Sequence, residues 1–91
     1  MTQVRAGVDL LDKRLVEMLA LRFGYMRAAA RIKPERGQVR DEARKAQVIA
    51  NAAAHAEALG LPREVVAKLW DELVEASIEY ELGHWDERRQ D

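Results

Sequence analysis

The sequence contains no cysteine, which excludes disulfide bonds, thiolate catalysis and zinc sites built on cysteine. Its two histidines, His55 and His84, lie too far apart in the chain to read as a helical metal pair, so we expect no bound metal. His55 stands alone in an alanine-rich segment and is interpreted as an interface residue rather than a ligand. The sequence thus predicts neither a thiol enzyme nor a metalloenzyme.

Long apolar runs and an excess of either charge are also missing. No stretch approaches the roughly 20 apolar residues needed to span a bilayer, so no membrane association is expected. The formal net charge of −1 provides no electrostatic footprint for nucleic acid. No basic start is followed by an apolar segment, so we expect no secretory signal and a cytoplasmic location.

What is present is a short chain with strong helical periodicity. Its 91 residues are 48% hydrophobic and 34% charged, which is typical of one soluble globular domain, here residues 1–91. A chain this short buries only a modest fraction of its surface as a monomer. No strands, repeats or low-complexity linkers are predicted, so the expected fold class is all-α.

The first third of the chain predicts one long helix over residues 3–33, which Pro34 ends. About 30 residues at 1.5 Å each give about 45 Å, whereas a compact chain of this length has a radius of gyration near 12 Å. Its apolar seam follows alternating spacings of four and three residues: Val4, Val8, Leu11, Leu15, Met18, Arg22, Tyr25, Ala29 and Ile32. Because such a helix overhangs its own domain, we expect its far half to pack on a second copy in an intertwined homodimeric bundle.

A second, shorter helix follows a polar loop over residues 34–39. Asp41 is expected to be its N-cap or an acid of its first turn, and Gly60 stops it after about Leu59. The segment is rich in alanine, which leaves little bulk on any face and permits close approach of another helix.

Pro62 opens the third helix, where its missing N–H costs nothing in the first turn. The face expected to be buried is apolar: Val66, Leu69, Trp70, Leu73 and Val74. The same stripe continues through Ser77 and Glu81, so a hydroxyl and a carboxyl replace hydrocarbon there. The tail over residues 86–91 is expected to be frayed.

Arg22 interrupts the apolar seam of the first helix. A guanidinium cannot be neutralised at accessible pH, and burying it unpaired costs several kcal/mol, so an anion must meet it. Lys33 lies within about 20° of the same direction and roughly 16 Å along the axis, so the two side chains could hold a small dianion between them. The alternative is that Arg22 pairs with a core carboxylate, while Lys33 is a solvated cation favoured by the helix dipole.

Polar groups on all three predicted helices fall on faces that should be core. Arg44 starts an apolar stripe of the second helix, and Ser77 and Glu81 lie on the stripe of the third. Arg5 lies about 100° away from Arg22 around the first helix, so a partner's pocket could receive it more easily than its own. The predicted core faces thus carry several cations but few carboxylates, which indicates a pocket for a small polyanion.

Taken together, these positions resemble the all-helical chorismate mutases, and the resemblance covers nearly all of the chain. That family implies three helices interlocked into a dimer with two shared active sites. By this resemblance Arg5, in VRAGVDLLDKRLVEML, reaches into the partner's site, Arg22 grips a substrate carboxylate and Lys33 contacts the ether oxygen. In VRDEAR, Asp41 and Arg44 match the segment that opens the second helix, where the arginine binds the second carboxylate.

The third helix completes the resemblance. Ser77 and Glu81 match the family's serine and its Gln-or-Glu position, the latter being a second donor to the ether oxygen. Because only the neutral acid can donate, Glu81 is expected to be protonated in the working enzyme. The implied reaction is the rearrangement of the dianion chorismate to prephenate in aromatic amino acid biosynthesis, which needs no cofactor.

One substrate-binding position departs from the mutase pattern. Mutases of this class commonly carry a glutamate directly after Arg44 to accept a hydrogen bond from the ring hydroxyl, but here the residue is Lys45, whose ammonium has no lone pair. The related isochorismate-pyruvate lyases, which form salicylate and pyruvate, lack that glutamate and resemble the string RFGYMRAAARIK as well, although they carry glutamine where Glu81 stands. We expect a chorismate mutase, with such a lyase as the first alternative. The second alternative is a non-catalytic helical dimerisation module whose cations form only interface ion pairs.

Overall fold

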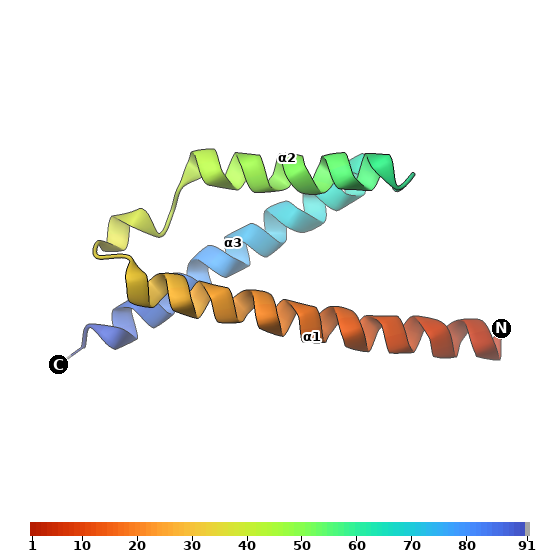
Figure 1. The fold of residues 1–91 in the computed structure, drawn as a ribbon, viewed down its shortest axis with the longest axis horizontal. Helices are drawn as coiled ribbons and strands as arrows, with labels where there is room; N and C mark the ends of the chain where they lie inside the picture. The colour runs from red at the N-terminus through yellow and green to blue at the C-terminus, as the bar shows by residue number, and fades with distance from the viewer. Residues whose placement is uncertain (91) are drawn as a thin grey trace.

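The structure is a computed structural model that describes residues 1–90, and it consists of three α-helices and one short 3-10 helix. In chain order these are α1 (Thr2–Ile32), η1 (Arg36–Gln38), α2 (Glu42–Ala58) and α3 (Arg63–Arg88) (Figure 1). The described part of the chain contains no strand, so the prediction of an all-α fold with one long and two shorter helices is confirmed. None of its helices is both long enough and apolar enough to cross a bilayer.

The helix ends follow local signals in the sequence. α1 ends before Pro34, with Lys33 as its C-cap in an extended conformation. The Asp41 side chain caps α2 by accepting a hydrogen bond of 3.0 Å from a backbone N–H of the first turn. Gly60 has a φ of +73°, the left-handed conformation that glycine tolerates after a helix. Pro62 is the N-cap of α3, one position outside the first turn in which it was predicted.

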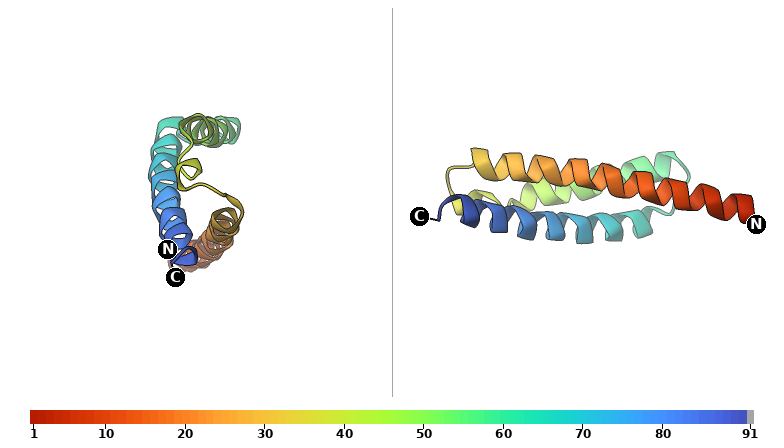
Figure 2. Two further views of the ribbon diagram at one scale, coloured as in Figure 1. Left: turned by 90° about the vertical axis from the view of Figure 1, so that its left-hand side faces the viewer. Right: turned by 90° about the horizontal axis from the view of Figure 1, so that it is seen from below.

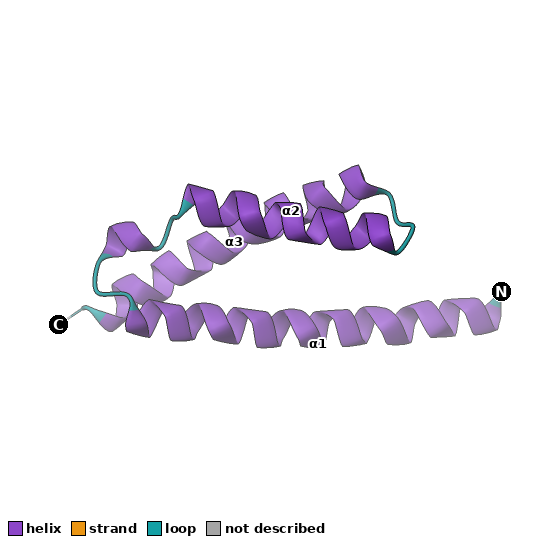
Figure 3. Cartoon of the chain, turned by 45° about the horizontal axis from the view of Figure 1, so that its top comes forward, coloured by secondary structure: helices purple, strands orange, loops and turns teal. Residues whose placement is uncertain are grey.

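α3 is the central element of the fold. It packs against both α1 and α2, which do not contact each other within residues 1–90. Seen end-on, the three helices form a trough, because α1 and α2 project from α3 in the same direction (Figure 2). The N-terminal part of α1 runs on beyond the other two helices (Figure 3). The core inside this trough is small: Val39, Val74 and Ile78, with Val48, Leu82 and Trp85 packed against them.

The N-terminal part of α1 has no core of its own. Every residue from 1 to 21 is exposed, including large apolar side chains of the seam: Val4, Val8, Leu11, Leu15 and Met18. The radius of gyration is 16.0 Å, compared with about 12 Å for a compact chain of this length. The exposed surface is 7078 Å², compared with about 5,400 Å² for a compact protein of this mass. The predicted overhang of α1 is confirmed, while the second copy stays a prediction.

Beyond the N-terminal part of α1, three further residues assigned to apolar stripes face solvent in the single chain. Tyr25 and Ile32 are 75% and 78% exposed, whereas Ala30, outside the predicted seam, is completely buried. At about 100° per residue, Tyr25 and Ile32 lie about 60° and 80° around the helix from Arg22, whereas the buried Ala30 lies about 80° away on the other side. The seam prediction is therefore wrong for the single chain at Tyr25 and Ile32, because these two positions point away from the buried side. Leu69 of α3, expected to be buried, is 55% exposed.

The C-terminal tail is helical where fraying was predicted. α3 continues to Arg88, and Asp86 accepts hydrogen bonds of 2.8 and 3.2 Å from the guanidinium of Arg36. Arg89 donates to backbone carbonyls at the end of α1. The prediction is wrong for residues 86–89 because these contacts join positions 50 or more apart in the sequence, which no local pattern shows. Asp91 lies outside the described residues.

An ion cluster joins α3 to the segment before α2 and to the start of α2 itself. Glu75 accepts hydrogen bonds of 3.0 and 3.1 Å from Arg40, and its carboxylate lies 3.1 Å from the Lys45 ammonium. The hydrogen bonds from Arg40 and then from Lys45 hold the pKa of the Glu75 carboxyl below its ordinary value. A carboxyl whose pKa is lower in the folded than in the unfolded chain stabilises the fold above its unfolded pKa. That contribution is lost as the pH falls through the folded value.

We therefore expect Glu75→Gln to lower the free energy of unfolding at pH 7, with the difference from the wild type shrinking as the pH falls below about 4. Urea unfolding followed by circular dichroism at pH 7 and pH 3 measures this difference. Glu79→Gln is the matched control, because Glu79 is an exposed carboxylate of α3 that forms no ion pair within residues 1–90. An equal difference at both pH values would contradict the role assigned to Glu75.

Candidate active site

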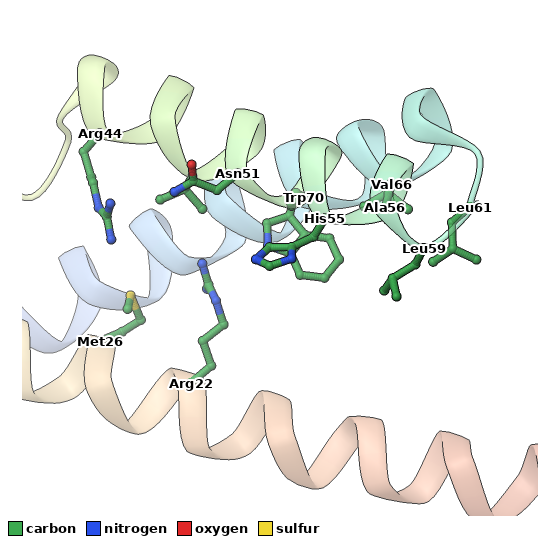
Figure 4. Close-up of a pocket in the computed structure, with 12 residues that line it drawn as sticks. Arg22, Met26, Arg44, Asn51, His55, Ala56, Leu59, Leu61, Val66 and Trp70 are labelled. Carbon is green, nitrogen blue, oxygen red and sulfur yellow. The ribbon is translucent and has the colours of Figure 1, made fainter.

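All the predicted site residues except Arg5 line one pocket. It lies between the C-terminal half of α1, the start of α2 and α3, and its volume is about 330 Å³. Its polar lining consists of Arg22, Lys33, Asp41, Arg44, Lys45, Ser77 and Glu81. A larger cavity of about 570 Å³ shares Arg22 and Arg44 with it and continues along α2 and α3 (Figure 4). Both volumes are in the range of small-molecule pockets.

Arg22 reaches from α1 into the pocket and meets a hydroxyl rather than a carboxylate. Its Nη1 donates a hydrogen bond of 2.6 Å to Ser77 Oγ, and Ser77 in turn donates one of 2.7 Å to the backbone carbonyl of Leu73. Burial lowers the pKa of Arg22 and the nearby charge of Arg44 lowers it further, yet a guanidinium stays protonated in proteins. No carboxylate among residues 1–90 forms an ion pair with Arg22, so the alternative of a core ion pair is wrong within the single chain.

Lys33 and Glu81 form a second polar contact between α1 and α3. The Nζ atom of Lys33 lies 2.7 Å from Oε2 of Glu81, whose side chain is only 5% exposed. Lys33 is therefore not simply a solvated cation at the end of a helix, as the alternative held. An ammonium has three N–H donors, so this pairing leaves two for another oxygen acceptor.

Arg44 and Arg22 approach the pocket from opposite sides. Asp41 caps α2 through the backbone N–H of Arg44, and so fixes the turn that carries this arginine. Figure 4 shows the two guanidinium groups pointing toward one another from α2 and α1. The side chain of Arg44 donates a hydrogen bond of 2.7 Å to Gln47, a neutral partner. Two cations that face each other repel, and an anion with two carboxylates placed between them would relieve that repulsion.

Comparison with known proteins decides the family. Residues 4–82 match the family described as chorismate mutase type II. The chain belongs to this family. A search of curated proteins finds no significant match. The matched region contains every predicted site residue from Arg5 to Glu81 and ends before the tail of α3 that contacts α1.

In this chorismate mutase type II chain, Arg5 lies apart from the pocket. It is exposed on the N-terminal part of α1 and does not line the pocket, whereas Arg22 on the same helix does. A single chain therefore brings the other predicted residues together but not Arg5. Its place in a partner's site stays a prediction.

Lys45 lines the pocket and is held by two acids of α3. Its Nζ lies 3.0 Å from Asp71 Oδ1 and 3.1 Å from Glu75 Oε2. Hydrogen bonding to Asp71, and then to Glu75, raises the pKa of Lys45. This position thus carries a charged donor where an acceptor is common in mutases. Neither acid was among the predicted site residues, although their spacing of four residues places them on one face of a helix.

Two further parts of the site were not predicted from the sequence. The larger cavity has a mainly apolar lining that includes Leu59 and Trp70, together with His55 (Figure 4). The tail residues Trp85 and Arg89 contact the backbone of α1 at the end that carries the site. Among residues 1–90, no three His, Asp or Glu side chains gather closely enough to hold a metal ion.

Proposed function

We propose that this protein is a chorismate mutase that converts chorismate to prephenate. Membership of the chorismate mutase type II family supports the reaction type. The observation that carries the proposal is that Arg22, without an ion-pair partner among residues 1–90, faces Arg44 across a pocket that also contains Lys33. Chorismate has two carboxylates, which two guanidinium groups on opposite walls would complement. We take residues 1–91 to act as one catalytic domain.

The proposed mechanism rests on orientation and on stabilisation of developing charge. Arg22 and Arg44 hold the two carboxylates so that the substrate adopts the reactive pseudo-diaxial conformer. As the ether C–O bond breaks and the new C–C bond forms, negative charge develops on the ether oxygen. In the proposed complex Lys33 and Glu81, which is protonated there, both donate to that oxygen. In the free chain the Lys33 ammonium instead donates to Oε2 of Glu81 at 2.7 Å. Ser77 keeps the Arg22 guanidinium in place.

The working unit in this proposal is an intertwined homodimer with two shared sites. The exposed apolar seam over residues 4–18 and the large surface of the single chain support it. The trough is open on the side away from α3 (Figure 2), and the lining of its larger cavity is mainly apolar. A second copy that laid its α1 there would bury its own seam and bring its Arg5 toward Arg22 and Arg44.

Glu81→Gln is expected to remove an alkaline decline in turnover. The neutral acid donates to the ether oxygen whereas the carboxylate repels the charge that develops there, so kcat of the wild type should fall once the bound enzyme loses this proton. Glutamine donates at any pH. Steady-state kcat measured between pH 5 and pH 9 checks this, with Glu79→Gln as the matched control. Loss of turnover at every pH, or an unchanged decline, would exclude Glu81 as a donor to the ether oxygen.

A second candidate function is isochorismate-pyruvate lyase, and the environment of Lys45 is the observation that favours it. The ammonium of Lys45 is bound to Asp71 and Glu75, so this position offers no acceptor for the ring hydroxyl of chorismate. Isochorismate carries the same two carboxylates, and the same pair of arginines would hold it.

Separate incubations of the purified protein with chorismate and isochorismate, followed by identification of the products, test both candidates. Prephenate formed from chorismate supports the mutase. Salicylate and pyruvate formed from isochorismate without prephenate from chorismate would support the lyase instead. Turnover of neither substrate would contradict both and favour the non-catalytic dimerisation module.

A further inference from the structure

The backbone of Lys33 is not held by α1 alone. Its N–H donates to the carbonyl of Ala29, but its φ of −67° and ψ of 124° turn the chain out of the helix, and Pro34 follows. The carbonyls of Lys33 and Ala30 belong to the last turn, where the helix itself supplies no N–H donors. The direction of the Lys33 side chain therefore depends on what fixes this turn from outside.

Two residues of the α3 tail supply the missing donors. The indole N–H of Trp85 donates to the carbonyl of Lys33 at 3.1 Å, and Arg89 Nη2 donates to the same carbonyl at 2.8 Å. Arg89 Nη1 donates to the carbonyl of Ala30 at 2.9 Å. The Arg89 guanidinium also stacks on the Trp85 ring, with its Cζ 4.1 Å from the ring centroid. We call these contacts of Trp85 and Arg89 with the end of α1 the clasp.

The two residues of the clasp lie on the same face of α3 as Glu81, which binds the Lys33 ammonium. Glu81, Trp85 and Arg89 follow one another at spacings of four residues, which stacks them along one side of the helix. Glu81 binds the ammonium of Lys33, while the other two bind its backbone. One face of α3 thus holds this lysine at both ends.

We propose that Trp85 and Arg89 are positioning residues that set the place of the Lys33 ammonium in the pocket. Neither lines the two cavities of the site, so their effect reaches the substrate only through Lys33. The inference rests on the proposed function, which gives this ammonium its catalytic task. A displacement of about 1 Å can lower a catalysed rate by about 100-fold, so a loosened clasp acts on kcat more than on KM.

The test compares Arg89→Ala with Arg88→Ala in the full-length protein. Arg88 is the matched control because its exposed side chain forms no hydrogen bond or ion pair within residues 1–90. Arg89→Ala should lower kcat by about tenfold with KM within about twofold, and Arg88→Ala should match the wild type. Arg89→Lys, which reaches one carbonyl at a time, should recover part of the loss. Trp85→Phe keeps the ring under Arg89 but lacks the indole N–H, and should lose less than Arg89→Ala.

Hydrogen exchange of the Lys33 backbone amide provides a readout that does not depend on turnover. Exchange should be faster in Arg89→Ala than in Arg88→Ala, because the last turn of α1 opens more often without the clasp. Circular dichroism of each variant establishes that the compared proteins are folded.

A folded Arg89→Ala protein with unchanged kcat, or with a change in KM alone, would overturn the inference. If Arg89→Ala does not fold, Arg89→Lys and Trp85→Phe provide the test in its place. A kcat equal to that of the wild type in both of these variants would likewise overturn the inference. A wild type that turns over neither chorismate nor isochorismate would instead contradict the proposed function. The catalytic role of the clasp would then be wrong as well, whereas hydrogen exchange would still show whether the clasp forms.

Discussion

Replacing Lys33 with alanine is expected to lower kcat by about 10² to 10³, with a much smaller change in KM. The ether oxygen acquires its charge mainly in the transition state, so a donor aimed at it lowers the barrier rather than strengthening substrate binding. The expected loss corresponds to about 2.7–4 kcal/mol, which is typical of removing one preorganised donor. The ammonium is preorganised in this chain because Glu81 binds it at 2.7 Å.

This contact determines the control, because Lys33→Ala also leaves the buried carboxyl group of Glu81 without its partner. A buried polar group without a partner destabilises the fold, and in its ionised form it would also repel an anionic substrate. The same substitution in a Glu81→Gln background removes that effect, and Lys68→Ala removes an exposed lysine outside both cavities. Steady-state kcat and KM of these proteins separate the two contributions. A change confined to KM would show that Lys33 only binds substrate.

Mixing Arg5→Ala chains with Arg22→Ala chains is expected to restore activity that neither variant has alone. If Arg5 acts across the dimer, each heterodimer contains one site with both substitutions and one site with neither. Random exchange of equal amounts makes about half of the dimers heterodimers, so recovery should approach about a quarter of wild-type activity in the mixture and about half in isolated heterodimers.

The mixed chains are refolded together so that they exchange, and the heterodimers are isolated through two different affinity tags. Each variant refolded alone gives the background rate. Absence of recovery in isolated heterodimers would place both arginines in one chain's site. Sedimentation of a compact, fully active monomer at micromolar concentration would refute the dimer itself.

Three helix boundaries could be predicted from the sequence because each is marked by a residue that acts within its own turn. Pro34 cannot continue a helix, Asp41 caps one, and Gly60 takes the left-handed conformation that ends one. The polar lining of the pocket could be predicted from the sequence for a similar reason. Arg22 and Glu81 interrupt apolar stripes, and these stripes indicate which face of a helix turns inward.

The pairing of these residues could not be predicted, because it depends on how two helices are rotated against each other. The contact between Lys33 and Glu81 joins positions 48 apart, and those of the clasp join positions 52 to 59 apart. A pattern within one helix carries no information about the partner of each side chain on the next helix. For this reason the tail that carries Arg89 was expected to be frayed, whereas it binds the end of α1.

The central claim is that Arg22 acts in a catalytic pocket for chorismate, and the rate of chorismate consumption tests it most directly. The comparison is between the wild type, Arg22→Ala and Arg31→Ala, because Arg31 is an exposed arginine of the same helix that lines neither cavity. The account predicts that the wild type and Arg31→Ala accelerate the reaction equally, while Arg22→Ala is slower in kcat/KM by about 10²-fold at equal helical content. A wild type that does not accelerate the reaction, or an Arg22→Ala variant with wild-type kcat/KM, would contradict it.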